Sequence, residues 1–362
     1  MKKVKKLIRQ VKIPQVKATS LFGRGAYFIR VAVGVFVSVL TFSAAADYSV
    51  HPGAEAFIQK MVGEHKFSEK EVKSLLAQAD RQESILEAIS RPAEKTKEWF
   101  EYRDIFIQES RIKQGLEFWN EHKATIQRAS AEMGVAPEII VAIIGVETRY
   151  GRHAGKYRVL DALATLGFDY PKRGKFFLGQ LEHYMLMTRE QEQDPLLLKG
   201  SYAGAMGYGQ FIPSSYRAYA VDFDGDNKVD IWNNPVDAIG SVANYFKAHK
   251  WKDGQPVLAR ARISDGYDKT VLNEKSKPKY SLAELGKKGF RLASAEDENK
   301  KGFAADSFSS ESKAIPLMYV GEHGKEFWLG FNNFYVITRY NRSHLYAMAV
   351  WELGEKIKQR MK

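Results

Sequence analysis

The stretch from Pro137 to Gly151, PEIIVAIIGVETRYG, constrains the fold more than any other part of the chain. A proline at the first helical position and an acid in the first turn are both favoured, and Pro137 and Glu138 match that pattern. Four positions spaced as i, i+3, i+4 and i+7 share one helical face: Ile140, Ile143, Ile144 and Glu147. The sequence therefore predicts a short buried helix whose apolar face carries a carboxyl group.

Glu147 is the unusual residue of that helix, and two interpretations of it are open. An unpaired carboxyl on a buried face is costly as an anion, so its pKa should rise until it can hold a proton near neutral pH. A protonated glutamate at a helix end, beside the Tyr150–Gly151 break, is what a general acid requires. Alternatively, Glu147 forms an ion pair with Arg149 or Arg152 and has only a structural role.

The basic residues of the chain are unevenly distributed. The 362 residues carry a formal net charge of +12, which would suit an anionic partner such as nucleic acid. However, nine of the 55 basic residues lie within the first 46 positions, where there is no acidic residue. The rest of the chain is nearly neutral, at +3. Nucleic acid is therefore not expected as a partner.

The first 46 residues have the features of a secretory signal peptide. The basic segment is followed by an apolar run from Val31 to Phe42 and by Ser43-Ala44-Ala45-Ala46, which contains an Ala-x-Ala site. We expect cleavage after Ala46 and a mature protein in the periplasm. An uncleaved membrane anchor is the alternative, although the apolar run is short for a membrane span. Because the chain has no cysteine, disulfides, thiolate catalysis and a lipid anchor on cysteine are excluded.

Helical patterns dominate the chain up to about residue 252. They predict an α domain over residues 47–115 and a helical core over residues 116–253. Residues 254–327 carry shorter, strand-like runs and are interpreted as a small β-rich domain inserted into the core. Residues 328–362 return to the core and end in a helix that Ser343 caps. The predicted fold class is α+β, mainly α. Individual helices are expected over residues 115–133, 176–188 and 235–249, and strands over 313–320 and 327–329.

A glycine-rich segment, Gly200 to Ser215 (GSYAGAMGYGQFIPSS), separates two of the expected helices. It has no Gly-Lys-Ser/Thr and no preceding strand pattern, which excludes a phosphate-binding loop. Its glycines allow the backbone to approach a ligand or a packed helix closely. Ser201 and Gln210 are its candidate hydrogen-bonding side chains.

An acidic loop follows, with side-chain or carbonyl oxygens offered at alternate positions: Asp222, Asp224, Asp226, Lys228 and Asp230. The spacing matches an EF-hand-like loop, in which the first three side chains and the carbonyl of the fourth position converge on one hard cation. The position that needs a left-handed backbone is Asn227, the best residue there after glycine. Asn233 replaces the usual glutamate, and the nearest later carboxylate is Asp237. We expect a structural Ca²⁺ site, with a solvated acidic turn as the alternative.

Four segments, in this order along the chain, resemble motifs of the membrane-bound lytic transglycosylase B family (glycoside hydrolase family 103), which are bacterial murein-cleaving enzymes. They are Glu147–Gly151 (ETRYG), Gly204–Ser215 (GAMGYGQFIPSS), Asp222–Asp226 (DFDGD) and Ile337–Asn341 (ITRYN). The resemblance covers nearly everything after the signal segment. It implies a lysozyme-like core flanked by an α domain and a small β domain, with an EF-hand-like calcium loop inside the core.

The same resemblance implies roles for individual residues. Glu147 would be the sole catalytic acid and base. The residues along the sugar cleft would be Tyr102, Ser201, Gln210, Phe211, Tyr245, Tyr340, Asn341 and Tyr346. The cation ligands would be Asp222, Asp224, Asp226, Asp237 and the backbone of Lys228. The family has a basic pair near the peptide-bearing sugar, which here reads Lys172-Arg173, and lysine lacks the bidentate fork of arginine.

The resemblance also implies a reaction. Most glycosidases need two carboxylates across the scissile bond, whereas this sequence offers one well-placed glutamate. In a lytic transglycosylase, Glu147 would protonate the oxygen that links N-acetylmuramic acid to N-acetylglucosamine. It would then take a proton from the C6 hydroxyl, which attacks C1 and closes a 1,6-anhydro ring.

The resemblance further implies that glycan strands of peptidoglycan are the substrate and that the cell-wall synthesis and hydrolysis machinery supplies protein partners. No organic cofactor is expected. Two rival functions remain open at this stage. The first is a lysozyme-like hydrolase that uses water, and the second is a non-catalytic murein-binding module in which Glu147 is structural.

Overall fold

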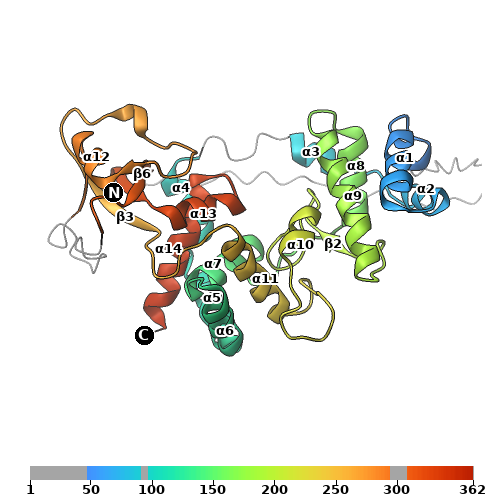
Figure 1. Cartoon of the computed structure of the whole chain (residues 1–362), viewed down its shortest axis with the longest axis horizontal. Coiled ribbons are helices and arrows are strands. Elements are labelled where there is room, and N and C mark those ends of the chain that lie inside the picture. The colour runs from blue at the N-terminus through green and yellow to red at the C-terminus, as the bar shows by residue number, and fades with distance from the viewer. Residues whose placement is uncertain (1–46, 91–96, 294–307, 362) are drawn as a thin grey trace, which may run out of the picture. The chain divides into compact units, whose positions relative to one another are not determined.

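The computed structural model of the chain describes residues 47–90, 97–293 and 308–361 (Figure 1). The predicted signal segment and its cleavage site lie outside these residues. Within them the chain is mainly α, with one five-stranded and one two-stranded sheet, which confirms the fold class predicted from periodicity.

The described residues form fourteen α-helices. These are α1 (Ala54–His65), α2 (Glu69–Ala77), α3 (Glu83–Ser90), α4 (Trp99–Phe106), α5 (Glu109–Glu121), α6 (Lys123–Met133), α7 (Pro137–Thr148), α8 (Val159–Asp169), α9 (Gly174–Glu190), α10 (Pro213–Tyr219), α11 (Pro235–Ala248), α12 (Leu282–Lys287), α13 (Asn332–Tyr340) and α14 (His344–Arg360). The predicted cap is confirmed, because the Ser343 hydroxyl accepts a hydrogen bond from the Tyr346 amide at the start of α14.

Two helical predictions need correction. The helix expected over residues 115–133 is interrupted at His122, whose φ of −109° and ψ of 24° are not helical, so α5 ends and α6 begins there. Helix α8 was not predicted at all. Residues 159–167 are all buried, including the polar Asp161 and Thr165, so the sequence shows no exposed polar face of an amphipathic helix.

Helix α7 also lies deeper than its pattern suggested. Residues 138–146 are all buried, so the face predicted from Ile140, Ile143 and Ile144 is only part of the buried surface of α7. The helix packs against α5, α6, α11 and α14. It is therefore the central helix of its group, which fixes the position of any side chain at its end.

The five-stranded sheet is antiparallel, with the order β4-β6-β7-β3-β5. Its strands are β3 (Leu258–Ile263), β4 (Tyr280–Ser281), β5 (Phe290–Leu292), β6 (Lys313–Gly321) and β7 (Gly324–Gly330). The strands predicted over residues 313–320 and 327–329 are confirmed as β6 and β7. A separate apolar cluster, which includes Leu285 of α12, Phe290 of β5 and Leu329 of β7, packs α12 against this sheet.

The packing of the helices groups elements that are distant in sequence. Helix α8 packs against α3 and α9, and α9 also contacts α1, whereas α4 and α5 pack against α14. Residue 115, where a domain boundary was expected, lies inside α5. The partition into sequence ranges remains a prediction.

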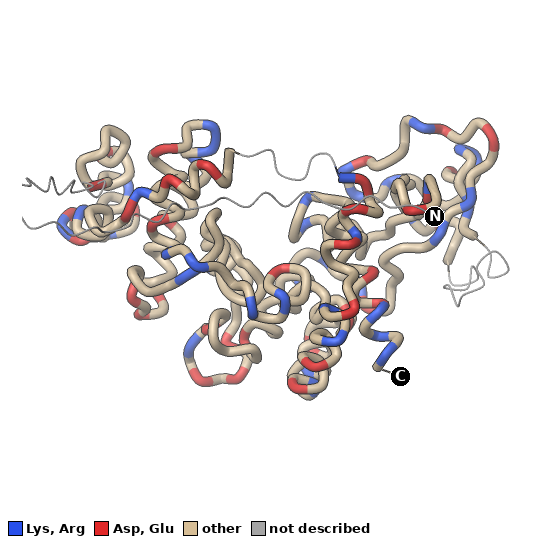
Figure 2. Tube along the Cα trace, turned by 180° about the vertical axis from the view of Figure 1, so that it is seen from behind, with Lys and Arg blue, Asp and Glu red and all other residues tan. Residues whose placement is uncertain are grey.

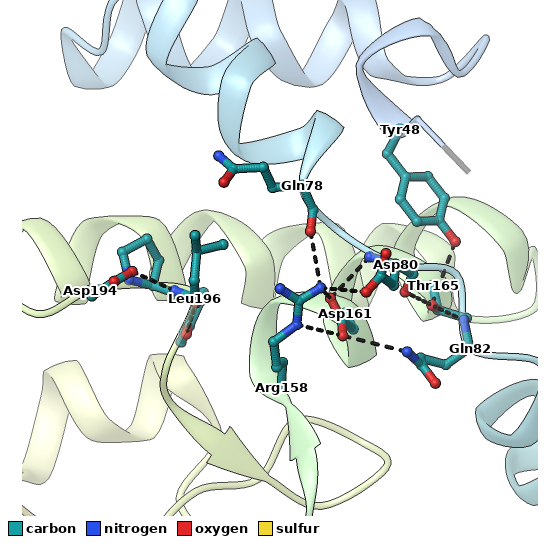
Figure 3. A network of polar contacts seen from close by, with 11 residues as sticks. Tyr48, Gln78, Asp80, Gln82, Arg158, Asp161, Thr165, Asp194 and Leu196 are labelled. Atoms are coloured by element: carbon teal, nitrogen blue, oxygen red, sulfur yellow. Dashed lines mark hydrogen bonds and ion pairs between the residues drawn. The ribbon is translucent and has the colours of Figure 1, made fainter. Parts of the chain in front are cut away.

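A polar network holds the loop after α2 against α8 (Figure 3). Asp161 is 2% exposed and accepts hydrogen bonds from the Asp80 amide at 3.0 Å and from Arg158 Nε at 2.8 Å. Arg158 also donates to the carbonyl oxygen of Gln78 at 3.0 Å. Arg158 lies in the short strand β1 (Tyr157–Arg158), which pairs with β2 (Lys199–Gly200) immediately before the glycine-rich segment. The network therefore fixes one side of the strand that leads into Ser201.

Acidic and basic positions are interspersed along most of the described helices, and acidic ones gather on the loop before α11 (Figure 2). No single helix in the described residues has the length and apolar composition of a membrane span. Helices α6 and α7 reach that length and apolar composition only when taken together, and the chain bends by 116° between them.

Candidate active site

Glu147 lies in the last turn of α7, where the helix ends abruptly. Arg149, Tyr150 and Gly151 have positive φ angles of 52°, 60° and 82°. The Thr148 hydroxyl stabilises this turn by accepting a hydrogen bond from the Gly151 amide at 3.0 Å. The negative end of the helix dipole therefore lies beside the Glu147 carboxyl and disfavours its anion.

The surroundings of Glu147 make it a proton-holding group at neutral pH. Burial of its side chain raises its pKa from 4.5 to about 7, and a hydrogen bond from Tyr346 opposes part of that rise. The Tyr346 hydroxyl donates to Glu147 Oε1 at 2.6 Å. Burial raises the pKa of Tyr346 well above its ordinary 10, so this hydroxyl keeps its proton and remains the donor.

The ion pair considered as the alternative role of Glu147 is not formed. Arg149 donates to Gln114 Oε1 at 2.7 Å and to the Ser110 hydroxyl at 3.0 Å. Arg152 lies 3.9 Å from the Glu117 carboxylate. Both arginines therefore point to α5, and neither offsets the rise that burial produces in the pKa of Glu147.

An aromatic group lies beside this carboxyl. Tyr340 has ring-centre distances of 5.9 Å to Phe211, 4.6 Å to Tyr245 and 5.7 Å to Phe246. Its hydroxyl donates to the carbonyl oxygen of Gly209. Burial raises the pKa of both Tyr340 and Tyr346, and the Glu147 carboxyl contributes in the same direction. Three of the predicted cleft residues, Phe211, Tyr245 and Tyr340, are thus brought together.

The two polar residues predicted on the glycine-rich segment help to shape it. Ser201 Oγ accepts hydrogen bonds from the amides of Ala203 and Ala205 at 3.3 and 3.1 Å. Gln210 has a φ of 52°, and its side-chain amide donates to the carbonyl oxygens of Ala154 and Gly207. The segment is therefore a preformed loop, held by its own side chains.

The remaining predicted cleft residues lie on α4, directly after α13 and in the turn before α9. Tyr102 of α4 is 4% exposed, packs against Phe106 at 5.2 Å and lies near Tyr346 of α14, against which α4 packs. Asn341 is exposed immediately after α13. Lys172 and Arg173 are exposed in the turn before α9, where the Arg173 guanidinium lies 4.4 Å from the centre of the Phe176 ring. In the described residues, no hydrogen bond or ion pair joins this basic pair to the Glu147 group.

Thr148 and Tyr208 are functional candidates that the sequence did not predict. The Thr148 hydroxyl lies 2.9 Å from the carbonyl oxygen of Tyr208 and 3.2 Å from that of Ile144, and its single proton serves one of them at a time. This contact joins the end of α7 to the glycine-rich segment. A threonine at the last position of an apolar helix was the available signal, since threonine favours hydrogen bonds to nearby backbone groups.

The acidic loop has the geometry of a cation site. One carboxylate oxygen from each of Asp222, Asp224 and Asp237 lies within 4.8 Å of the other two. Asn227 has the predicted left-handed backbone, with a φ of 70°. Asp226 is not part of this cluster, and one of its oxygens accepts the Lys228 amide at 2.9 Å. Carboxylate oxygens converging in this way fit a hard cation such as Ca²⁺.

Asp237 is completely buried, and its carboxylate joins the two sides of the acidic loop. Oδ1 accepts the Phe223 amide at 2.7 Å and Oδ2 accepts the Asp230 amide at 2.8 Å. Burial raises the pKa of Asp237, and the neighbouring carboxylates of Asp224 and Asp222 contribute in the same direction. Mutual repulsion of this kind is relieved when a cation binds.

Comparison with known proteins gives a consistent family relationship. A family model described as Transglycosylase SLT domain matches residues 49–355. Membrane-bound lytic murein transglycosylase B of Escherichia coli (strain K12) is 45% identical over 325 residues, which cover 86% of this chain and 84% of that protein.

Solved structures agree. Soluble lytic transglycosylase SltB1 from Pseudomonas aeruginosa is 49% identical, with a TM-score of 0.78 over 84% of this chain and 98% of that one. The Escherichia coli lytic transglycosylase Slt35 in complex with calcium is 44% identical, with a TM-score of 0.75 over 87% of this chain and 96% of that one. SltB3 from Pseudomonas aeruginosa in complex with NAG-anhNAM-pentapeptide is 32% identical, with a TM-score of 0.73 over 84% of this chain and 78% of that one. The lysozyme-like fold predicted for the core is thereby confirmed.

Proposed function

The chain belongs to the transglycosylase SLT family and is a lytic transglycosylase that acts on peptidoglycan, and we propose that Glu147 is the single general acid and base of its reaction. The bond cleaved is the β-1,4 bond between N-acetylmuramic acid and N-acetylglucosamine. The product carries a 1,6-anhydromuramic acid end.

The observation that carries this proposal is the raised pKa of Glu147 together with its contact to Tyr346. A carboxyl with a pKa of about 7 is largely protonated just below neutral pH and can still give up that proton. Tyr346 donates to Oε1, which leaves Oε2 to carry the proton towards the glycosidic oxygen. The same hydrogen bond stabilises the carboxylate that remains after proton transfer.

The proton returns in the second step. As the bond between C1 and the leaving oxygen breaks, the C6 hydroxyl of the muramic acid attacks C1. Its proton passes to the Glu147 carboxylate, which restores the starting state, and no water is consumed. This scheme needs one carboxyl group. In the described residues, no second carboxylate contributes to the raised pKa of Glu147, which favours the scheme over a two-carboxylate hydrolase.

The residues around Glu147 would bind the glycan strand. The ring of Tyr340 is half-buried and would pack against a sugar ring, with the buried rings of Phe211 and Tyr245 behind it. The Ser201 hydroxyl proton and the Gln210 amide oxygen would offer polar groups. Asn341, exposed directly after α13, would extend this site, and the buried Tyr102 of α4 would hold Tyr346 in place beside it. Lys172 and Arg173 would contact the peptide-bearing part of the substrate through their charges.

Asp222, Asp224 and Asp237 would hold a Ca²⁺ ion, with Asp226 and the carbonyl oxygen of Lys228 completing the coordination. The converging carboxylates and the left-handed Asn227 support this assignment, and a relative has been solved in complex with calcium. The cation would supply a structural crosslink of the loop and no proton-transfer chemistry.

We place the enzyme in the cell envelope, in keeping with a relative named as membrane-bound, and expect export to the periplasm through residues 1–46. Sequencing the N-terminus of the mature protein tests this. A start near Asp47 in a periplasmic fraction supports export with cleavage, and full-length protein found only with membranes contradicts it. The cell-wall machinery remains the proposed source of protein partners.

Replacing Glu147 with glutamine tests the proposed role of the residue. Glutamine keeps the volume but cannot donate and retake a proton, so Glu147→Gln should lower turnover of purified peptidoglycan at least 10²–10⁴-fold, with binding retained. Glu138→Gln is the matched control on the same helix and should keep its turnover. Near-normal activity of the Glu147 variant would remove this residue from the mechanism.

A further inference from the structure

The segment from Asp230 to Trp232 contacts Asp237 of the acidic loop, Tyr208 of the glycine-rich segment and Lys199 of β2. On one side, the Asp230 amide donates to Oδ2 of Asp237 at 2.8 Å, which ties the segment to the carboxylate cluster of the acidic loop. The Asp230 carboxylate in turn accepts the amides of Trp232 and Asn233 at 2.8 and 2.9 Å. The position of the Trp232 backbone is therefore set by the acidic loop.

Through Ile231, the same segment is linked to the end of α7. The carbonyl oxygen of Ile231 accepts the Tyr208 amide at 2.9 Å, and the carbonyl oxygen of Tyr208 lies 2.9 Å from the Thr148 hydroxyl. Thr148 directly follows Glu147. Gly207 permits this approach, because a Cβ atom there would lie 2.3 Å from the Ile231 oxygen.

Through Trp232, the segment also contacts β2, the strand that directly precedes Ser201. Trp232 Nε1 donates to the carbonyl oxygen of Lys199 at 2.9 Å, and the Trp232 ring packs against Tyr216 at 5.7 Å. Lys199 belongs to β2, whose other side is held by β1 and the Arg158 network (Figure 3). Because Ser201 follows β2 directly, the indole hydrogen bond connects this part of the glycine-rich segment to the acidic loop.

We propose that Trp232 is a positioning residue through which the acidic loop holds the Ser201 side of the substrate site, so that a cation bound in the loop strengthens glycan binding. The inference rests on the proposed cation site and on glycan binding near Ser201. Asp222, Asp224 and Asp237 would hold the cation, the Asp237 carboxylate accepts the Asp230 amide, and the Trp232 indole would pass the resulting constraint to Lys199. A cation that stabilises one arrangement of the loop must then bind more tightly when the glycan is bound, and the reverse.

The test measures binding without turnover, in a Glu147→Gln background, with N-acetylglucosamine–N-acetylmuramic acid pentapeptide as the probe. Its dissociation constant should rise about fivefold or more when Ca²⁺ is replaced by a chelator, which is the lower end of usual coupling between sites. Trp232→Phe keeps an aromatic ring but removes the indole donor. It should remove this Ca²⁺ dependence while keeping the rise in melting temperature that Ca²⁺ produces, because the carboxylates are untouched.

Trp251→Phe is the matched control, since it makes the same change in a partly buried ring that packs against Phe246 at 5.5 Å, away from the acidic loop. It should keep the Ca²⁺ dependence of binding. The proposal is overturned if chelation leaves the glycan affinity unchanged in the protein that keeps Trp232. It is equally overturned if the glycan affinity of the Trp232→Phe variant still depends on Ca²⁺. It is also overturned if Trp232→Phe abolishes Ca²⁺ binding itself, because Trp232 would then belong to the loop rather than transmit its state.

The same link can be tested by nuclear magnetic resonance on the unmodified protein, which has six tryptophans. The indole N–H signal of Trp232 in a ¹⁵N-correlated spectrum should shift, and its hydrogen exchange should slow, when Ca²⁺ is added. An indole signal that is the same with Ca²⁺ and with chelator would refute the link. Because no turnover is measured, these results are independent of whether the reaction yields anhydro or reducing ends.

Discussion

Glu147→Gln should stabilise the protein, and the gain should grow with pH. In the native state burial raises the pKa of Glu147 from 4.5 to about 7, so the folded protein binds this proton more tightly than the unfolded chain does. Stability from this group is therefore fully present below about pH 4.5 and is lost as the pH rises to about 7. Glutamine does not titrate, so the variant escapes that loss.

The size of the effect follows from the two pKa values. One pKa unit is worth about 1.4 kcal/mol, so the full loss above pH 7 is about 3 kcal/mol. The linkage relation gives a gain for the variant of about 1 kcal/mol at pH 5 and about 3 kcal/mol at pH 8. A change in packing or in the contact to Tyr346 would shift both values equally, which leaves a pH-dependent increase of about 2 kcal/mol as the quantity to test.

Denaturant unfolding at pH 5, 6, 7 and 8 measures this increase as the difference in unfolding free energy between the variant and the unmodified protein. Glu138→Gln is the control, since Glu138 lies on the same helix but accepts a hydrogen bond from Lys358 at 2.5 Å. Removing that charge should lower the stability at pH 7 to 8, which is the opposite sign. A stability difference for Glu147→Gln that is flat or falls with pH would refute the assignment of a raised pKa.

Two further predictions concern the hydroxyl beside Glu147 and the acidic loop. Tyr346→Phe removes a hydrogen bond that favours the carboxylate, so the pKa of Glu147 should rise further and the high-pH limb of kcat/KM should move up by about one pH unit. Tyr340→Phe, whose hydroxyl donates to a carbonyl oxygen, should change KM but not that limb, and an unmoved limb in the Tyr346 variant would contradict the role of its hydroxyl. Saturating Ca²⁺ should stabilise the protein by about 2.7 kcal/mol at a hundredfold excess over Kd, and Asp224→Ala should abolish the gain while leaving the backbone contacts of Asp237 intact. A melting temperature that does not respond to chelation would show that the loop holds no metal.

Local sequence patterns predicted the elements whose signals are themselves local. The helix that carries Glu147 in its last turn, the Ser343 cap and strands β6 and β7 depend on spacings of a few residues, and the structure contains all of them. The break at His122 was missed because neither glycine nor proline marks it. Strands β1 and β2 have two residues each, which is too short for an alternating pattern.

The contacts that define the site are not local, and this limits what the sequence alone could reveal. Tyr346 and Glu147 are 199 positions apart, and the structure was needed to show that the hydroxyl of one contacts the carboxyl of the other. Spacing left the ion pair with Arg149 open, and only the geometry shows that this arginine points to Gln114. The spacing singled out Asp237 only as the nearest later carboxylate, outside the standard loop length, and the family resemblance named it a ligand.

The mass of the products released from purified peptidoglycan tests the central claim most directly. If Glu147 passes one proton out and takes one back while the C6 hydroxyl attacks C1, each muramic acid product ends in a 1,6-anhydro ring. Such a product is one water lighter than the product of hydrolysis and has no reducing end. The account predicts this species as the main product of the unmodified enzyme. Reducing-end muropeptides as the main product would contradict it and would require a second carboxylate that activates water.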